Sequence, residues 1–479
     1  MAKNYFYNLL LSLANLLFPI LSFPYVSRVL GPEGIGKVQF IFSFAQYFAL
    51  IASIGIPIYG MKEIARHRDD KEGRSKVFSE LIAIYMMTSA VLSSLYLTTV
   101  YSFSYFSPNR DMYLGAGLMV LLGFSYIEWL YTGMEQFKSI ALRSVAFKLI
   151  GLVLLYLFIK DRSDFRAYLY IMMFSFLGNN ILSFFLIKDK IKPIFAGLEL
   201  RKHVMPLLFI LGTTLAASMY TDMDTVLLGF LSNDKTVGLY TAAVKLSKIT
   251  LPFVTSMGVI LMPKIAKDFA EKNMLEVQKT LDQTFRFLIF FAVPIVFGLA
   301  ILAPEFIALF SGKEFLPATS SMRLLSLLPL IIGFGHLFLF LILVPSGRNR
   351  EMFFCVLGGL VMSLILNVLL IPHFQEVGSS IANICSEIIV TLLYFYFIKR
   401  DFSFTYDWSL LAKAVLSALI FIPVIWLARA LSLPLVYTLI LSIAGCGITY
   451  IGIQWLLFRN NFVVDILDFI KMKLNRGEG

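Results

Sequence analysis

The sequence predicts an all-α membrane protein with many transmembrane helices. Of its 479 residues, 58% are hydrophobic and only 15% are charged, and the mean hydropathy is +0.81. This composition excludes an ordinary soluble domain. Uncharged stretches long enough to cross the roughly 30 Å hydrocarbon core recur along the whole chain. The three cysteines lie within apolar runs without metal-ligand spacing, so neither a disulfide framework nor a metal site is expected.

The first two predicted spans flank the glycine-rich stretch RVLGPEGIGK, residues 28–37. A nucleotide-binding glycine loop needs a short buried strand before it and an amphipathic helix after it. Here twenty-two uncharged residues precede the stretch, from Tyr5 to Val26, and a second uncharged run follows it to Gly60. We therefore interpret the stretch as a tight turn between two membrane helices.

A hydropathy window of about 19 residues divides the chain into fourteen predicted spans. Twelve of them form two sets of six, separated by a basic segment near residue 190, and two more follow. They lie near residues 5–27, 37–60, 77–101, 112–134, 139–159, 167–187, 204–231, 236–262, 284–310, 316–345, 352–371, 376–398, 409–430 and 433–458.

The distribution of basic residues supports this division and orients the chain. With the N-terminus inside, 26 of the 41 Lys and Arg residues fall in cytoplasmic segments and 9 fall on the opposite side. This bias follows the positive-inside rule, and it predicts that both termini are cytoplasmic. It also explains the net charge of +11 without nucleic-acid binding, since the basic loops face anionic lipid headgroups.

An internal repeat relates the two six-helix sets. The segment from Gly36 to Met61 and the segment from Gly238 to Met262 each follow a Leu-Gly pair and end at a basic exit. Repeats with the same orientation predict two lobes around a central cavity. We expect an N-terminal lobe over residues 1–200, a second lobe over 201–400, and two further helices with a cytoplasmic tail over 401–479.

The layout and two motifs resemble a known transporter family. The turn SRVLGPEGIGKVQ and the hairpin YTDMDTVLLGFLSNDKTVGLYTAAVKL look like those of Wzx-type polysaccharide-export flippases, in the multidrug/oligosaccharidyl-lipid/polysaccharide superfamily. The resemblance implies a non-enzymatic transporter in the bacterial cytoplasmic membrane. It would move a polyprenyl-pyrophosphate-linked oligosaccharide outward by alternating access, without a cofactor. It also suggests a polysaccharide polymerase and a chain-length regulator as partners.

Ionisable residues inside predicted spans are costly, so they usually face a cavity or pair with each other. We expect cations of the cavity to bind the substrate head group, and carboxylates to exchange a proton or Na⁺. The predicted head-group residues are Arg28, Lys245, Lys248 and Arg323, and the predicted ion-coupling residues are Asp222, Asp224 and Glu387. A salt-bridged hairpin without a transport role is the alternative for Asp222 and Lys245.

Polar stripes at helical spacing predict surfaces that face sugars, because hydroxyl and amide groups bond to hydroxyls. One stripe holds Asn8, Ser12 and Asn15, and another holds Ser380 and Asn383. A third, in the seventh span, contains Thr214, Ser218, Thr221 and Thr225. Hydrogen bonds between helices are the alternative explanation for each residue.

Three other functions remain open at this point. A multidrug or cation exporter would favour acidic sites, and a lipid II flippase would carry arginines inside its first spans, whereas Arg28 lies only at their mouth. A membrane glycosyltransferase or polymerase would need larger loops than residues 61–76 and 263–283 provide.

The predicted topology can be tested by labelling single cysteines in a variant that lacks the native three. Reagent added outside intact cells should label Ser107→Cys and Lys235→Cys but not Glu72→Cys or Lys272→Cys, because only the first two lie in predicted outer loops. Labelling of Glu72→Cys from outside would contradict the orientation.

Overall fold

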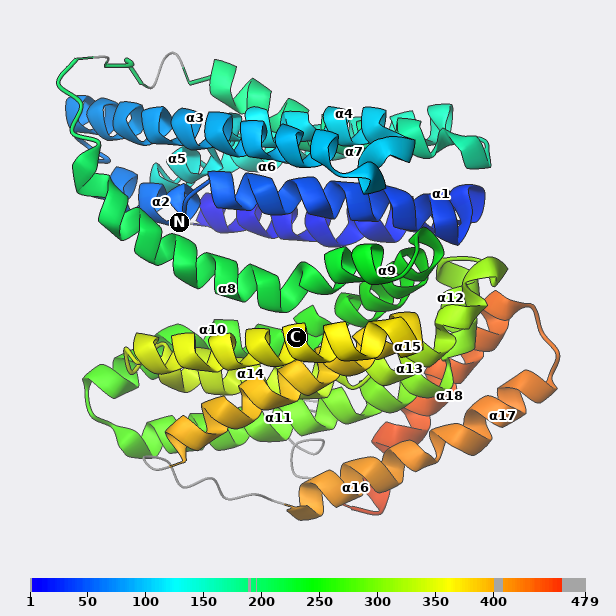
Figure 1. Cartoon of the computed structure of the whole chain (residues 1–479). Helices are drawn as coiled ribbons and strands as arrows, with labels where there is room; N and C mark the ends of the chain where they lie inside the picture. Colours follow the sequence, from blue (N-terminus) through cyan, green and yellow to red (C-terminus); the bar gives the residue numbers. More distant parts are fainter. Residues whose placement is uncertain (1, 188–190, 195, 400–407, 459–479) are drawn as a thin grey trace, which may run out of the picture. The chain divides into compact units, whose positions relative to one another are not determined.

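The computed structural model describes residues 2–187, 191–194, 196–399 and 408–458, and in these ranges it contains helices and no strand. The predicted all-α membrane fold is confirmed (Figure 1). The chain divides into two compact units, Met1–Gly238 and Leu239–Gly479. The predicted lobes, 1–200 and 201–400 with two added helices, stay a prediction.

Unit 1 holds the helices that build the candidate site. They are α1 (Ala2–Ala52), α2 (Ile56–Arg66), α3 (Lys71–Ser102), α4 (Arg110–Leu121), α5 (Glu128–Gly133), α6 (Phe137–Phe158), α7 (Phe165–Phe185) and α8 (Arg201–Leu231). Helix α9 (Asp234–Ile249) begins in unit 1 and continues into unit 2.

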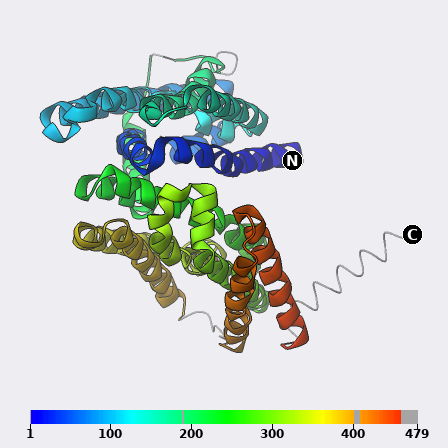
Figure 2. The same ribbon diagram turned by 90° about the vertical axis from the view of Figure 1, so that its right-hand side faces the viewer.

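Unit 2 holds the remaining helices, and its last spans run side by side (Figures 1 and 2). Its helices are α10 (Leu251–Ala270), α11 (Met274–Ile301), α12 (Ala303–Phe310), α13 (Thr319–Leu325), α14 (Leu328–Phe338), α15 (Asn349–Ile398), α16 (Trp408–Leu419), α17 (Phe421–Ala430) and α18 (Leu435–Leu456). Tyr450 of α18 donates a hydrogen bond to the carbonyl of Phe290 in α11, 3.0 Å away, and so fixes the C-terminal helices to the unit.

Two long helices are broken where the sequence predicts separate spans, and the predicted number of fourteen stays a prediction. Among the described residues, ten helices are long and apolar enough to cross a membrane, or twelve when each of two bent pairs counts as one span. Two of them, α1 and α15, each contain two predicted spans and break at Gly31 (φ +68°) and Gln375 (φ +49°). The break at Gly31 confirms that RVLGPEGIGK is a turn between two helices.

Aromatic rings fill the interior of unit 1 around Phe44 of α1. Its ring centroid lies 5.6 Å from that of Tyr96, 5.3 Å from that of Phe106 and 5.8 Å from that of Phe230. Edge-to-face and tilted pairs of this kind add to the hydrophobic free energy of burial. This cluster therefore joins α1 to α3 and to α8 within unit 1.

The two copies of the predicted repeat touch each other at the turns where they begin. A methyl group on Gly36 would lie 1.7 Å from the carbonyl oxygen of Asp234, and one on Gly238 would lie 1.9 Å from that of Pro32. Each carbonyl belongs to the residue four positions before the other copy's glycine, so the two contacts mirror each other. Lys37 and Asp234 add an ion pair at 3.7 Å. Only glycine permits this approach of backbones.

We predict that Gly36→Ala lowers the stability of the purified protein by about 1–3 kcal/mol, because the added methyl group must displace backbone atoms. A fall in the thermal unfolding midpoint would report it. Gly298→Ala is the matched control, because Gly298 is also helical and has no atom within 4 Å of the added carbon. Equal midpoints for the two variants would contradict the close contact.

Candidate functional site

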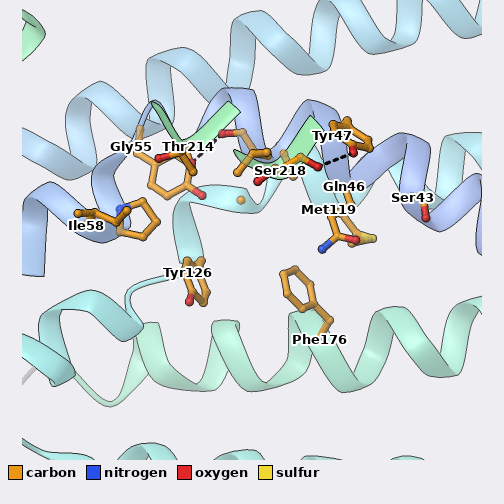
Figure 3. Close-up of a pocket in the computed structure, with 16 residues that line it drawn as sticks. Ser43, Gln46, Tyr47, Gly55, Ile58, Met119, Tyr126, Phe176, Thr214 and Ser218 are labelled. Atoms are coloured by element: carbon orange, nitrogen blue, oxygen red, sulfur yellow. Dashed lines mark hydrogen bonds between the residues drawn. The ribbon is translucent and has the colours of Figure 1, made fainter. Parts of the chain in front are cut away.

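A cavity of about 370 Å³ lies within unit 1, between α1, α2, α3, α4, α7 and α8 (Figure 3). Its walls combine hydroxyl and amide groups with aromatic rings. The lining residues are Ser43, Gln46, Tyr47, Ala49, Leu50, Ser53, Gly55, Pro57, Ile58, Tyr85, Met119, Gly123, Tyr126, Phe176, Thr214 and Ser218.

Helical spacing places the polar groups of two helices on the cavity wall. Ser43, Gln46 and Tyr47 lie on one face of α1, and Thr214 and Ser218 lie one turn apart on α8. The Tyr47 hydroxyl donates a hydrogen bond to the carbonyl of Ser218 at 3.0 Å and so ties the two helices together. Two members of the predicted stripe on the seventh span therefore line the cavity.

Aromatic groups form the opposite wall. Figure 3 shows Tyr126 and Phe176 facing the cavity across from the side chains of α1 and α8. Tyr126 follows a short 3₁₀ turn, Gly123–Ser125, that interrupts the helical path between α4 and α5. This interruption turns the Tyr126 ring toward the cavity.

Three polar groups at the cavity are available to a ligand. The side chains of Gln46, Tyr85 and Tyr126 form no hydrogen bond with the part of the chain that the structure describes. By contrast, Ser43 accepts a hydrogen bond from Gln39 at 3.2 Å, and Thr214 donates to the carbonyl of Ile210 at 2.8 Å. The polar groups of Gln46, Tyr85 and Tyr126 must therefore bond to water or to a ligand, because a polar group without a partner costs free energy.

The cavity wall carries no ionisable acid or base other than tyrosine among the lining residues. It therefore offers neither a carboxylate for a cation nor an ammonium for a phosphate. An apolar and aromatic wall with a few convergent hydrogen-bonding groups suits a neutral, hydroxyl-rich ligand. The arrangement can bind and orient such a ligand.

The predicted polar face of the first span lies on the outside of unit 1. Asn8, Ser12 and Asn15 are exposed on α1, and Lys148 of α6 donates a hydrogen bond to the side-chain oxygen of Asn15. Arg28 is exposed near the outer turn, where it donates to the carbonyl of Pro24 at 2.6 Å. Their predicted contacts with substrate stay predictions.

The predicted ion-coupling hairpin spans both units. Asp224 is buried in α8, with 2% of its surface exposed. The side chain of Asp222 lies outside the described residues. Lys245 and Lys248 are half-buried in the part of α9 that belongs to unit 2. The proposed competition between a pyrophosphate and a carboxylate for Lys245 therefore stays a prediction.

The other predicted residues of unit 2 differ in exposure. Arg323 is exposed on α13, and Glu387 is half-buried in α15. Ser380 and Asn383 are buried in α15, and Ser380 donates a hydrogen bond to the carbonyl of Glu376 at 2.8 Å. The structure leaves their predicted roles open.

The sequence analysis missed Gln46, Tyr85 and Tyr126 as site residues. Ser43, Gln46 and Leu50 do recur at helical spacing in the second predicted span, and this pattern was the available signal. The two tyrosines gave none, because each is a single aromatic residue in an apolar run.

Two family models match overlapping parts of the chain. Residues 1–269 match the family model described as a polysaccharide biosynthesis protein. Residues 181–445 match the model described as the lipid II flippase MurJ. Each match covers more than half of the 479 residues.

Individual relatives cover nearly the whole chain. A protein of Shigella dysenteriae named "Putative O-antigen transporter" is 24% identical over 408 residues, which make up 82% of this chain and 98% of that protein. The inward closed structure of a lipid II flippase MurJ has a TM-score of 0.73 at 17% identity and covers 96% of this chain and all of that one.

An inward-facing multidrug transporter of the MOP superfamily has a TM-score of 0.59 at 16% identity, over 81% of this chain and 94% of that one. These two structural likenesses establish a shared fold. The chain therefore belongs to the polysaccharide biosynthesis protein family, whose model matches more than half of its length.

Proposed function

We propose that this multi-pass membrane protein is a flippase for a polyprenyl-pyrophosphate-linked oligosaccharide, such as the repeat unit of an O-antigen, capsule or exopolysaccharide. The uncharged, hydroxyl-rich and aromatic cavity of unit 1 carries the proposal. Sugars present hydroxyl groups to amides and tyrosines, and their C–H faces pack against rings. The relative named as an O-antigen transporter supports this substrate class.

The charged residues would serve the other end of the substrate. Lys245 and Lys248, with Arg28 and Arg323, would hold the pyrophosphate, because ammonium and guanidinium groups pair with phosphate oxygens. Asp222, Asp224 and Glu387 would exchange a proton or Na⁺ as the protein alternates between inward and outward states. The sugars of the substrate would then bind at a neutral site, and its pyrophosphate would bind at a separate charged site.

The cellular setting belongs to the same proposal. The basic loops favour a bacterial cytoplasmic membrane with both termini inside, and a polymerase with a chain-length regulator would take up the flipped unit. The uncharged cavity argues against a multidrug cation exporter, whose site needs a carboxylate. The lipid II flippase remains the second candidate, because that family model matches residues 181–445.

Replacing Gln46, whose side-chain amide faces the cavity, should weaken transport. In cells lacking their own flippase gene, Gln46→Leu should lower surface polysaccharide about tenfold, because the substrate loses hydrogen bonds together worth about 1.4 kcal/mol. Protein abundance in the membrane should stay near normal, since Gln46 is exposed and bonds to nothing in the described chain. The amount of polysaccharide per cell is the measurement.

Gln283→Leu is the matched control, because Gln283 is an exposed glutamine on α11 and lines no part of this cavity. Normal export by Gln46→Leu would show that Gln46 and its cavity do not bind the sugars of the substrate. Equal loss in both variants would point to a general effect on the protein.

A further inference from the structure

A buried cluster of titratable residues lies in unit 1 away from the cavity. Glu80 of α3 has no exposed surface, and His203 of α8 is 2% exposed. The His203 Nε2 atom lies 2.8 Å from Glu80 Oε2, and its Nδ1 atom lies 2.9 Å from the hydroxyl of Tyr59 in α2. The cluster therefore connects three helices through one imidazole ring.

The second partner of Glu80 reaches the surface. Lys202 Nζ lies 3.0 Å from Glu80 Oε2 and is 43% exposed, so the buried carboxylate is linked to water through one side chain. The backbone N–H of Glu199 donates to Glu80 Oε1 at 2.9 Å. Buried charges are tolerated only when paired and hydrogen-bonded in this way.

The same face of α3 holds the segment that joins the sixth and seventh predicted spans. Ser75 accepts a hydrogen bond from the N–H of Lys192 at 3.2 Å, and Ser79 accepts one from the N–H of Ile194 at 2.9 Å. Lys76 pairs with the Glu199 side chain at 2.9 Å, and this bond lowers the pKa of the Glu199 carboxyl. We call the described residues 191–194 and 196–200 the linker. Glu80 is one of its four anchors on α3, with Ser75, Lys76 and Ser79.

Both protonation states of His203 satisfy this geometry. In the neutral ring, Nε2–H donates to Glu80 and Nδ1 accepts from the Tyr59 hydroxyl. In the protonated ring, Nδ1–H donates to the Tyr59 oxygen, which can also accept. A proton therefore enters without leaving a ring nitrogen unpaired, and it converts the hydrogen bond to the Glu80 carboxylate into an ion pair between two charged groups. Histidine is the side chain whose charge ordinarily changes between pH 5 and 8.

We propose that Tyr59, Glu80 and His203 form a proton-binding site that sets how tightly the linker is held on α3. The charged groups around it are Lys202 and Glu199, with Lys76 beyond them, and Glu63 and Arg66 beside Tyr59 on α2. The protonated ring holds Glu80 in place, and Glu80 holds the linker. The contact is tightest at acid pH and weakens as the pH rises.

This site makes the proton the coupling ion, and that part rests on the proposed function. A linker between the sixth and seventh predicted spans that loosens when its proton leaves would let these two spans move relative to α3 during transport. Each cycle would then carry a proton through His203. The proton-dependent binding of the linker to α3 does not depend on which molecule is transported.

The direct test is hydrogen exchange of the linker in the full-length purified protein, corrected for the intrinsic pH dependence of exchange. The amides of Lys192, Ile194 and Glu199 should be about fivefold more protected from exchange at pH 6 than at pH 8. A change of about fivefold corresponds to the weakest coupling that is typical between two sites. In His203→Gln the ratio should fall to about one, because the amide bonds to both partners but does not titrate.

His67→Gln is the matched control. Within the described chain, the His67 side chain bonds only to the carbonyl of Glu63, and His67 lies outside the cluster. It should keep the wild-type ratio. Equal protection at both pH values in the wild type would overturn the proposal, and this result does not require any variant to fold. A pH ratio that survives in His203→Gln would overturn it as well.

Transport in vesicles separates this inference from the proposed function. The wild type should flip the lipid-linked glycan about fivefold faster with an imposed pH gradient, and His203→Gln should flip at the rate seen without one. A wild type that flips no glycan would refute the proposed function and leave the exchange result standing. A gradient response retained by His203→Gln would refute the coupling role alone.

Discussion

The need to pair every polar group in a region without water governs this structure. In hydrocarbon, an unpaired N–H or C=O group costs several kcal/mol, so the backbone must be helical wherever it meets lipid. Side-chain hydroxyls follow the same rule. Ser22, Ser79 and Ser247, for example, each donate to the carbonyl one turn earlier. Serine and threonine are therefore tolerated inside apolar spans.

The same constraint decides where the backbone departs from a helix. The break at Gly31 falls between two spans, and the turn that follows it packs its carbonyl groups against a glycine of the second repeat. The departure at Gly123–Ser125 adjoins the cavity. These two departures thus lie in a loop and at a cavity wall, where irregular backbone is tolerated in a membrane protein.

Local features of the sequence predicted the spans well. Hydropathy and basic loops depend on neighbouring residues, so the turn at 28–37 and the helical segments could be recognised without a structure. The repeat also placed Gly36 and Gly238 as equivalent positions. Their direct contact could not be predicted, since a weak sequence match gives equivalence and no distance.

The sites depend on contacts between distant parts of the chain, which one sequence does not reveal. The cavity joins Gln46 to Tyr126 and Thr214 across the intervening helices. Glu80 and His203 are separated by 123 positions, and neither stood out in the sequence. The predicted sugar-facing residues were chosen by stripes on single helices. Such stripes identify polar faces but do not show which face meets a cavity.

The central claim is that the neutral cavity of unit 1 recognises sugars, and substrate binding tests it most directly. Purified protein in lipid vesicles would be titrated with the glycan-bearing polyprenyl pyrophosphate and with the same lipid lacking its sugars. The account predicts that the glycan-bearing lipid binds about tenfold more tightly, corresponding to about 1.4 kcal/mol from hydrogen bonds and ring contacts. Equal affinities for the two lipids would contradict it.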